Sequence, residues 1–370
     1  MSIRRLRMSK LHELAEAGQA IWIDYIKRSM TTNGELVGLV DQGLRGLTSN
    51  PSIFQNAIAG SEEYDADIRA LAAEGKSVDE IYETLAIDDL RRATDILRPV
   101  YDATNGADGF ASLEVDPRLA HDTENTISQA KRLFATVDRP NLMIKVPGTS
   151  AGLPAISELI GSGINVNVTL IFSVGNYRKV ADAYLDGLRR HVENGGDPKK
   201  VASVASFFVS RIDSAVDGQL ERLGNSELQG KTAIANAKIA YAAFQEIFSG
   251  DGWDRLAKKG ARVQRPLWAS TSTKNPSYSE TIYVDTLIGP ETVNTLPPNT
   301  LKAFLNHGEI AQTLADDLAG AQRHMQALAN AGVNLSQVTD KLQADGVAAF
   351  EKAFNELIAS IADKRERIAA

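Results

Sequence analysis

The sequence predicts an α/β fold, a (β/α)8 TIM barrel that forms one catalytic domain over residues 1–370 and carries additional helices. Two observations support this. Short apolar, β-branched runs alternate with longer amphipathic stretches, and eight such runs follow one another along most of the chain. This alternation favours parallel βαβ units that close into a barrel. An open doubly wound sheet is the alternative, but no G-x-G-x-x-G motif follows the first expected strand.

Eight segments are expected to form the strands, because each is a short apolar or β-branched run bounded by polar residues, glycine or proline. In chain order they are residues 21–25, 46–49, 109–115, 142–146, 164–171, 201–209, 266–270 and 281–287. Between them, Ser77 and Glu80 form a capping box at the start of a long helix. Further helices are expected to begin near Asp122, Ala151, Ser173, Ile212 and Lys231.

The chain beyond the eighth expected strand is assigned to a connection followed by helices. Residues 294–300 contain two adjacent prolines and two asparagines, which is typical of a loop. The helices that follow include residues 346–368, whose apolar side chains share one face. We expect this C-terminal helix to pack on the barrel exterior, with a dimer seam as the alternative.

Composition excludes several classes of function. The net charge of −7 argues against a nucleic-acid partner, and the densest basic run, residues 4–7, is terminal. The absence of cysteine excludes thiolate chemistry and suits a reducing cytoplasm. No apolar run approaches the roughly 20 residues of a membrane helix. The five histidines lack zinc-motif spacing, so no metal is expected.

Catalytic residues of a barrel lie at the carboxyl ends of its strands and in the loops that follow. Polar residues stand at most of these expected ends, and their convergence on one rim predicts a single site. They are Asp24, Asn50, Glu114, Lys145, Asn167, Thr169, Ser206 and Lys274.

Lys145 is the clearest catalytic candidate, since it lies among apolar, strand-forming residues in the run LMIKVPGT. A strand of a parallel barrel is covered on both faces, so this amine must point into the barrel or be paired. Burial disfavours the ammonium and leaves free amine to attack a ketone. We interpret Lys145 as a Schiff-base nucleophile; a structural ion pair is the alternative.

Two carboxylates are candidates for proton transfer. Glu114 ends the third expected strand and could move protons during imine formation; a salt bridge to Lys145 without that duty is the alternative. Asp24 ends the first strand and could take a proton from a substrate hydroxyl, or it could be a structural acceptor. Arg211 and Lys274 follow the sixth and seventh strands, where barrels often bind phosphate.

These residues resemble the transaldolase family, the class I, Schiff-base-forming enzymes of the pentose phosphate pathway. The resemblance covers nearly the whole chain and rests on ordered motifs at residues 22–24, 47–52, 113–119, 143–145, 164–173 and 207–211. It implies a reaction that moves a dihydroxyacetone unit from sedoheptulose 7-phosphate to glyceraldehyde 3-phosphate. No cofactor is implied, because the protonated imine is the electron sink. An aldolase that releases free dihydroxyacetone and a non-catalytic sugar-phosphate binder are the alternatives.

The resemblance also implies a role for each residue. Lys145 would form the imine, Glu114 and Thr169 would hold a catalytic water, and Asp24 would act as acid or base. The dihydroxyacetone unit would be bound by Asn50, Asn167 and Ser206, in a pocket shaped by Phe208, with the phosphate on Arg211. Lys274 stands where the family often has a second arginine. A lysine keeps the positive charge but cannot bind a phosphate through the two parallel hydrogen bonds of a guanidinium. We expect a cytoplasmic monomer or homodimer acting on sugar phosphates.

Overall fold

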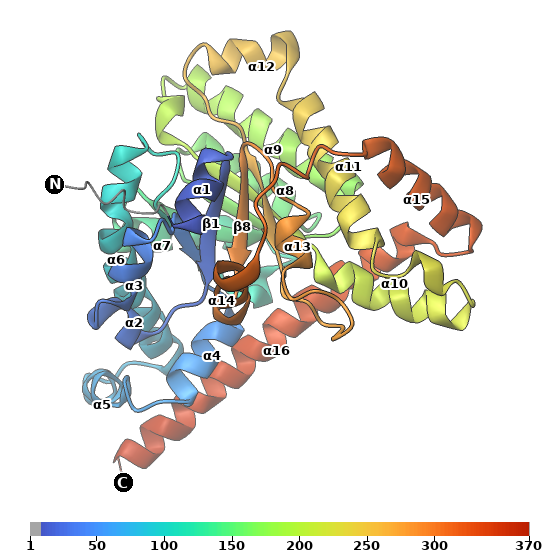
Figure 1. Ribbon diagram of the computed structural model, residues 1–370. Coiled ribbons are helices and arrows are strands. Elements are labelled where there is room, and N and C mark those ends of the chain that lie inside the picture. Colours follow the sequence, from blue (N-terminus) through green and yellow to red (C-terminus); the bar gives the residue numbers. More distant parts are fainter. Residues whose placement is uncertain (1–8, 370) are drawn as a thin grey trace, which may run out of the picture.

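The structure is a computed structural model that describes residues 9–369, within which eight parallel strands close into a barrel (Figure 1). The predicted fold class is therefore confirmed. The basic run at residues 4–7 lies outside the described residues. The strands are β1 (Gln19–Asp24), β2 (Gly46–Thr48), β3 (Phe110–Glu114), β4 (Leu142–Pro147), β5 (Val166–Ile171), β6 (Ser203–Phe208), β7 (Arg265–Ala269) and β8 (Thr292–Leu296).

Each strand pairs in parallel with the next in sequence, and β8 returns to pair with β1, where Ile23 lies opposite Leu296. Nearly every strand residue is buried, as expected for strands covered on both faces. The pairing of β5 with β6 is irregular between Val168 and Ile171, and Leu170 there has a φ of 60°. Such bulges re-aim side chains near barrel rims.

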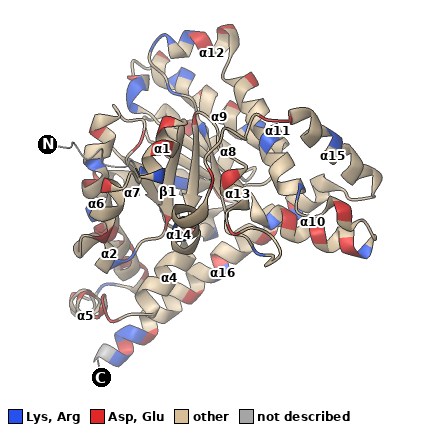
Figure 2. Cartoon of the chain, viewed as in Figure 1, with Lys and Arg blue, Asp and Glu red and all other residues tan. Residues whose placement is uncertain are grey.

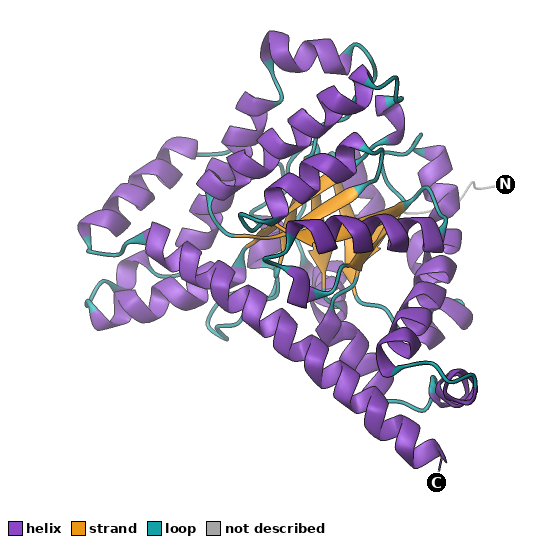
Figure 3. Ribbon diagram, turned by 180° about the vertical axis from the view of Figure 1, so that it is seen from behind, coloured by secondary structure: helices purple, strands orange, loops and turns teal. Residues whose placement is uncertain are grey.

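Helices surround the barrel (Figures 1 and 3), and the predicted helix starts are confirmed to within two residues. The Ser77–Glu80 capping box is present at the start of the longest of the first helices. The first group is α1 (Lys10–Glu16), α2 (Arg28–Thr32), α3 (Glu35–Asp41), α4 (Pro51–Ala59), α5 (Asp65–Ala73), α6 (Val78–Ala103), α7 (Thr123–Val137) and α8 (Gly152–Gly161). The second is α9 (Val174–Glu193), α10 (Ser210–Arg222), α11 (Thr232–Ile247), α12 (Gly250–Ala257), α13 (Ile282–Asp285), α14 (Pro298–His307), α15 (Leu318–Asn330) and α16 (Leu335–Ala369).

The predicted eighth strand is wrong. Residues 281–287 contain the short helix α13, and the Thr281 hydroxyl donates a hydrogen bond to the Asp285 carboxylate at 2.6 Å. The strand lies instead at Thr292–Leu296, in the segment that was expected to begin a connection. A short β-branched run cannot be distinguished from a helical turn by periodicity. The prolines after it end the strand, and Pro298 begins α14 at a position that suits proline.

The C-terminal helix α16 packs on the barrel as predicted but begins earlier than residue 346, at Leu335. It runs across the carboxyl end of the barrel and contacts α4, α5, α6 and α10 (Figures 1 and 3). Its apolar face is buried from Val347 to Ile361. The helix is therefore more than an outer layer, because it covers the rim where a barrel has its active site.

The outer helices carry both signs of charge, which Figure 2 shows interspersed along α10 and α12. No helix within residues 9–369 is long and apolar enough to cross a membrane. In the same part of the chain, no group of three or more His, Asp or Glu side chains is arranged to hold a metal ion.

The contact between β1 and β2 depends on a glycine. A Cβ on Gly46 would lie 2.7 Å from the Phe110 carbonyl oxygen and from two ring carbons of the buried Trp22. We expect Gly46→Ala to lower the free energy of unfolding by about 1–3 kcal/mol through overpacking. Gly38→Ala in α3, where a Cβ meets nothing within 4 Å, should instead raise it by about 0.5–1 kcal/mol. Urea unfolding of both variants measures this, and equal midpoints would contradict the packing argument.

Candidate active site

A cavity of about 190 Å³ lies at the carboxyl end of the barrel. Eight of the ten residues singled out in the sequence line it: Asp24, Asn50, Lys145, Thr169, Ser206, Phe208, Arg211 and Lys274. Glu114 and Asn167 do not line it. Because the lining residues come from strands and loops far apart in sequence, closure of the barrel is what brings them together.

Lys145 projects from β4 with only 5% of its surface exposed. Its Nζ lies 3.2 Å from Glu114 Oε2 and donates a hydrogen bond to the Ser49 carbonyl oxygen at 3.1 Å. Glu114 and Lys145 are opposite each other in the pairing of β3 with β4, so strand register sets this contact. The ion pair considered from the sequence is present, and its amine also reaches the cavity.

Burial raises the pKa of Glu114 to about 7, although the Lys145 charge and its hydrogen bond oppose this rise. The carboxyl group lies in the wall of a second, smaller cavity of about 50 Å³, together with Tyr82 and Phe354. Glu114 therefore contacts the Lys145 amine without lining the main cavity itself. A carboxyl group with a pKa near neutrality can both give and take a proton there.

Asp24 lies at the end of β1 and accepts a hydrogen bond from the Thr48 hydroxyl at 2.7 Å. Thr48 in turn lies 2.7 Å from the Thr295 hydroxyl of β8. Burial raises the pKa of Asp24, while the charges of Lys145 and Arg211 and the Thr48 hydrogen bond lower it. A carboxylate held in this way is a suitable proton acceptor facing the cavity.

The hydroxyl and amide groups divide into cavity-lining and supporting residues. Asn167 accepts a hydrogen bond from the Ser206 hydroxyl at 2.7 Å and donates one to Ser112 at 3.0 Å. It therefore orients Ser206 without lining the cavity itself. Asn50 caps α4 by accepting from the Ile53 amide at 3.0 Å. The buried Thr169 hydroxyl has no hydrogen-bond partner among residues 9–369. Its bonding capacity is thus free for a molecule in the cavity.

Two cations face the cavity without forming an ion pair with any described residue. The Arg211 guanidinium lies 5.2 Å from the centre of the Phe208 ring, and Lys274 donates a hydrogen bond to Ser272 at 2.5 Å. Burial lowers the pKa of Arg211; burial and the Arg211 charge lower that of Lys274. Placing two unpaired cations side by side favours an anion between them.

Sequence reasoning missed several lining residues. Thr295 and Pro297 were missed because β8 was placed in the wrong segment, while Ser270 and Ser272 lie in the loop after β7 without a distinguishing pattern. Phe350 comes from α16 and lies 5.3 Å from Lys145 Nζ, measured to the ring centre. In the sequence it is one apolar residue of a helical stripe. No local signal separates it from the others.

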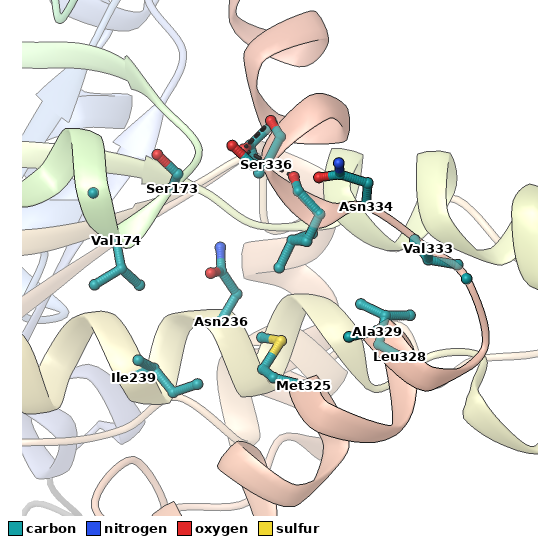
Figure 4. Close-up of a pocket in the computed structure, with 14 residues that line it drawn as sticks. Ser173, Val174, Asn236, Ile239, Met325, Leu328, Ala329, Val333, Asn334 and Ser336 are labelled. Carbon is teal, nitrogen blue, oxygen red and sulfur yellow. Dashed lines mark hydrogen bonds between the residues drawn. The ribbon is translucent and has the colours of Figure 1, made fainter.

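A larger cavity, about 670 Å³, lies between α9, α11, α15 and α16 (Figure 4). Its wall is mostly apolar, with Met325, Leu328 and Ile239 on one side and Asn236 and Ser173 nearby. None of its 14 lining residues carries a charge or a catalytic carboxylate or amine. The candidate catalytic groups therefore line the smaller cavity at the barrel rim and not this one.

Comparison with known proteins gives a consistent result. Residues 21–361 match the family model described as Transaldolase/Fructose-6-phosphate aldolase. The transaldolase of Acidothermus cellulolyticus is 50% identical over 361 residues, which cover 96% of this chain and 97% of that protein. The transaldolase of Mycolicibacterium smegmatis is 50% identical over 353 residues, covering 94% and 95%. That of Trichodesmium erythraeum is 47% identical over 372 aligned positions, covering 97% and 98%.

Because of Glu114, the free energy of unfolding should fall as the pH rises towards neutrality. Its ordinary pKa is 4.5, and burial raises the folded-state pKa to about 7. Between these values the folded chain holds a proton that the unfolded chain releases. The contribution is therefore fully present below pH 4.5 and is lost as the pH rises through about 7.

Glu114→Gln cannot ionise and should remove this contribution. The difference in unfolding free energy between the parent protein and the variant should then vary across this window and level off on either side. Urea titrations at a series of pH values measure it. A difference that stays constant with pH would show that the raised pKa is wrong.

Proposed function

The chain belongs to the transaldolase/fructose-6-phosphate aldolase family, and from this premise we propose that Lys145 is the nucleophile that forms its Schiff base. The reaction is that of a transaldolase: a dihydroxyacetone unit passes from sedoheptulose 7-phosphate to glyceraldehyde 3-phosphate, giving erythrose 4-phosphate and fructose 6-phosphate. The observation that carries the proposal is the buried Lys145 amine, which reaches the cavity with Glu114 at 3.2 Å.

Capture of the donor begins with attack of the Lys145 amine on the ketone carbon. The ketone oxygen takes up protons and leaves as water, and the nitrogen becomes a protonated imine. Glu114 supplies and recovers the proton, a role supported by its contact with the amine and by its pKa of about 7. The free Thr169 hydroxyl is available to hold the departing water.

Cleavage of the carbon–carbon bond requires a base at the substrate hydroxyl. Asp24 takes that proton, the hydroxyl carbon becomes an aldehyde, and the bonding electrons move to the imine to give a neutral enamine. The acceptor aldehyde then reverses these steps, and Asp24 returns the proton to the new hydroxyl. Its position in the cavity wall and its raised pKa support this role.

Substrate binding is assigned to the remaining polar groups. Asn50 and Ser206 hydrogen-bond the dihydroxyacetone unit, and Asn167 orients Ser206 through their 2.7 Å hydrogen bond. Phe208 shapes the pocket and orients the Arg211 guanidinium above its ring. Together, the charges of Arg211 and Lys274 bind the phosphate of each substrate.

The family description also includes an aldolase that releases free dihydroxyacetone. The relatives quoted above are named transaldolases, which favours transfer. Measuring turnover with and without an aldehyde acceptor distinguishes the two. The single-domain organisation, the choice between monomer and homodimer, the cytoplasmic location and the absence of a nucleic-acid partner stay predictions from the sequence.

Replacement of the nucleophile tests the proposal directly. With fructose 6-phosphate and borohydride, the parent protein should give one reduced adduct, and peptide mapping should locate it on Lys145. Lys145→Ala should give no adduct and should lose turnover by orders of magnitude, because no other group offers the electron sink. An adduct on another lysine, or near-normal turnover in the variant, rejects Lys145 as the nucleophile.

The phosphate site predicts a selective loss. Lys274→Ala should lower kcat/KM about tenfold or more for phosphorylated donors, since a charge-assisted contact contributes about 1.5–3 kcal/mol. Unphosphorylated ketose donors should be affected much less. Lys302→Ala, which removes an exposed charge from α14, controls for net charge. An equal loss for both donor classes would place Lys274 outside the phosphate site.

A further inference from the structure

We propose that Phe350, carried by α16, is a catalytic residue of this reaction. The face of its ring stabilises positive charge on the Lys145 nitrogen, first in the ammonium and then in the protonated imine. The inference rests on the proposed role of Lys145 as the Schiff-base nucleophile. A helix outside the barrel strands would thus help to stabilise the protonated imine that accepts electrons.

Three groups surround the Lys145 nitrogen. Glu114 Oε2 lies 3.2 Å away, the Ser49 carbonyl oxygen accepts its hydrogen bond at 3.1 Å, and the Phe350 ring centre lies 5.3 Å away. That last distance is within the range of cation–π attraction, which strengthens when the pair is desolvated. Phe350 is 7% exposed and Lys145 5%, so little water screens the contact.

The ring is held in place by contacts that α16 makes with the barrel rim. Gln343, two helical turns before Phe350, donates hydrogen bonds to the carbonyl oxygens of Gly148 at 3.1 Å and Leu170 at 3.0 Å. These carbonyls follow β4 or lie in β5, the strands that carry Lys145 and Thr169. These hydrogen bonds therefore hold α16 against the strands that carry Lys145 and Thr169.

Two further features fix the path of α16. A Cβ on Gly346 would lie 3.0 Å from Leu170 Cδ2, so glycine permits the close approach of helix and strand. Farther along, the buried Lys364 amine donates to an oxygen of Asp65 in α5 at 2.6 Å. Anchors on both sides of Phe350 leave its ring little freedom to move away from the amine.

The chemistry explains why a ring face suits this position. When an ammonium and a ketone form a protonated imine and water, the positive charge stays on the nitrogen. When the carbon–carbon bond breaks, the electron pair moves onto the imine and the charge disappears. The ring therefore favours the charged imine over the neutral enamine, and it leaves the step from ammonium to imine unchanged because both species carry the charge. It holds the captured donor in the form that accepts electrons.

A matched pair elsewhere in the protein provides the control. The Lys10 amine lies 5.7 Å from the centre of the Phe304 ring in α14, and Phe304 is fully buried. This pair has the same residue types at a similar distance but does not line the catalytic cavity. Changes at Phe304 report the general effect of altering a buried ring beside a lysine.

The test replaces Phe350 with phenylalanines that carry increasing numbers of ring fluorines. Fluorine withdraws electron density from the ring face while changing its shape little, so the fold is retained. Each protein is equilibrated with saturating fructose 6-phosphate without acceptor, and borohydride then reduces the protonated imine but not the enamine. The ratio of trapped to untrapped enzyme should fall steadily, by on the order of tenfold across the series.

The same series at Phe304 should leave the trapped ratio unchanged. A flat response at position 350, or an equal decline at both positions, overturns the role of Phe350. Failure of the parent protein to form an adduct on Lys145 would instead reject the nucleophile itself, so the two proposals fail in distinguishable ways. Phe350→Leu should lower the ratio as far as the most fluorinated ring does.

Discussion

Burial of the Lys145 amine beside the Glu114 carboxylate is the constraint on which the rest of the site depends. Removing two charged groups from water is costly, and their mutual attraction offsets that cost only when the geometry is good. The pairing of β3 with β4 supplies this geometry, because it sets the two residues opposite each other. The raised pKa of Glu114, about 7, then allows its carboxyl group to exchange a proton near neutral pH.

The barrel and α16 make different contributions to this environment. The strands end in carboxylates, amides and hydroxyls that can bind a polar substrate, and the loops after β6 and β7 add cations. These groups alone would leave the amine facing water on one side. On that side α16 places the Phe350 ring next to the amine. Hydrogen bonds from Gln343 hold the helix against β5 and the loop after β4.

Much of this arrangement follows from local sequence signals. Seven of the eight strands were placed correctly because apolar β-branched runs and their polar ends are local features, and the same ends identified Asp24 and Lys145. The eighth was misplaced because adjacent prolines were interpreted as a loop rather than as the boundary between β8 and α14. The contact of Phe350 with Lys145 could not be predicted, since it depends on where a distant helix crosses the rim.

The order of the chain has a consequence for biosynthesis. All eight strands lie before residue 297, whereas the ring beside the Lys145 amine belongs to a helix that begins at Leu335. Domains generally fold as units during translation. The surroundings of the Lys145 amine are therefore complete only once the last helix has been synthesised. A chain that ends before α16 would carry all eight strands but would lack the ring beside the Lys145 nitrogen.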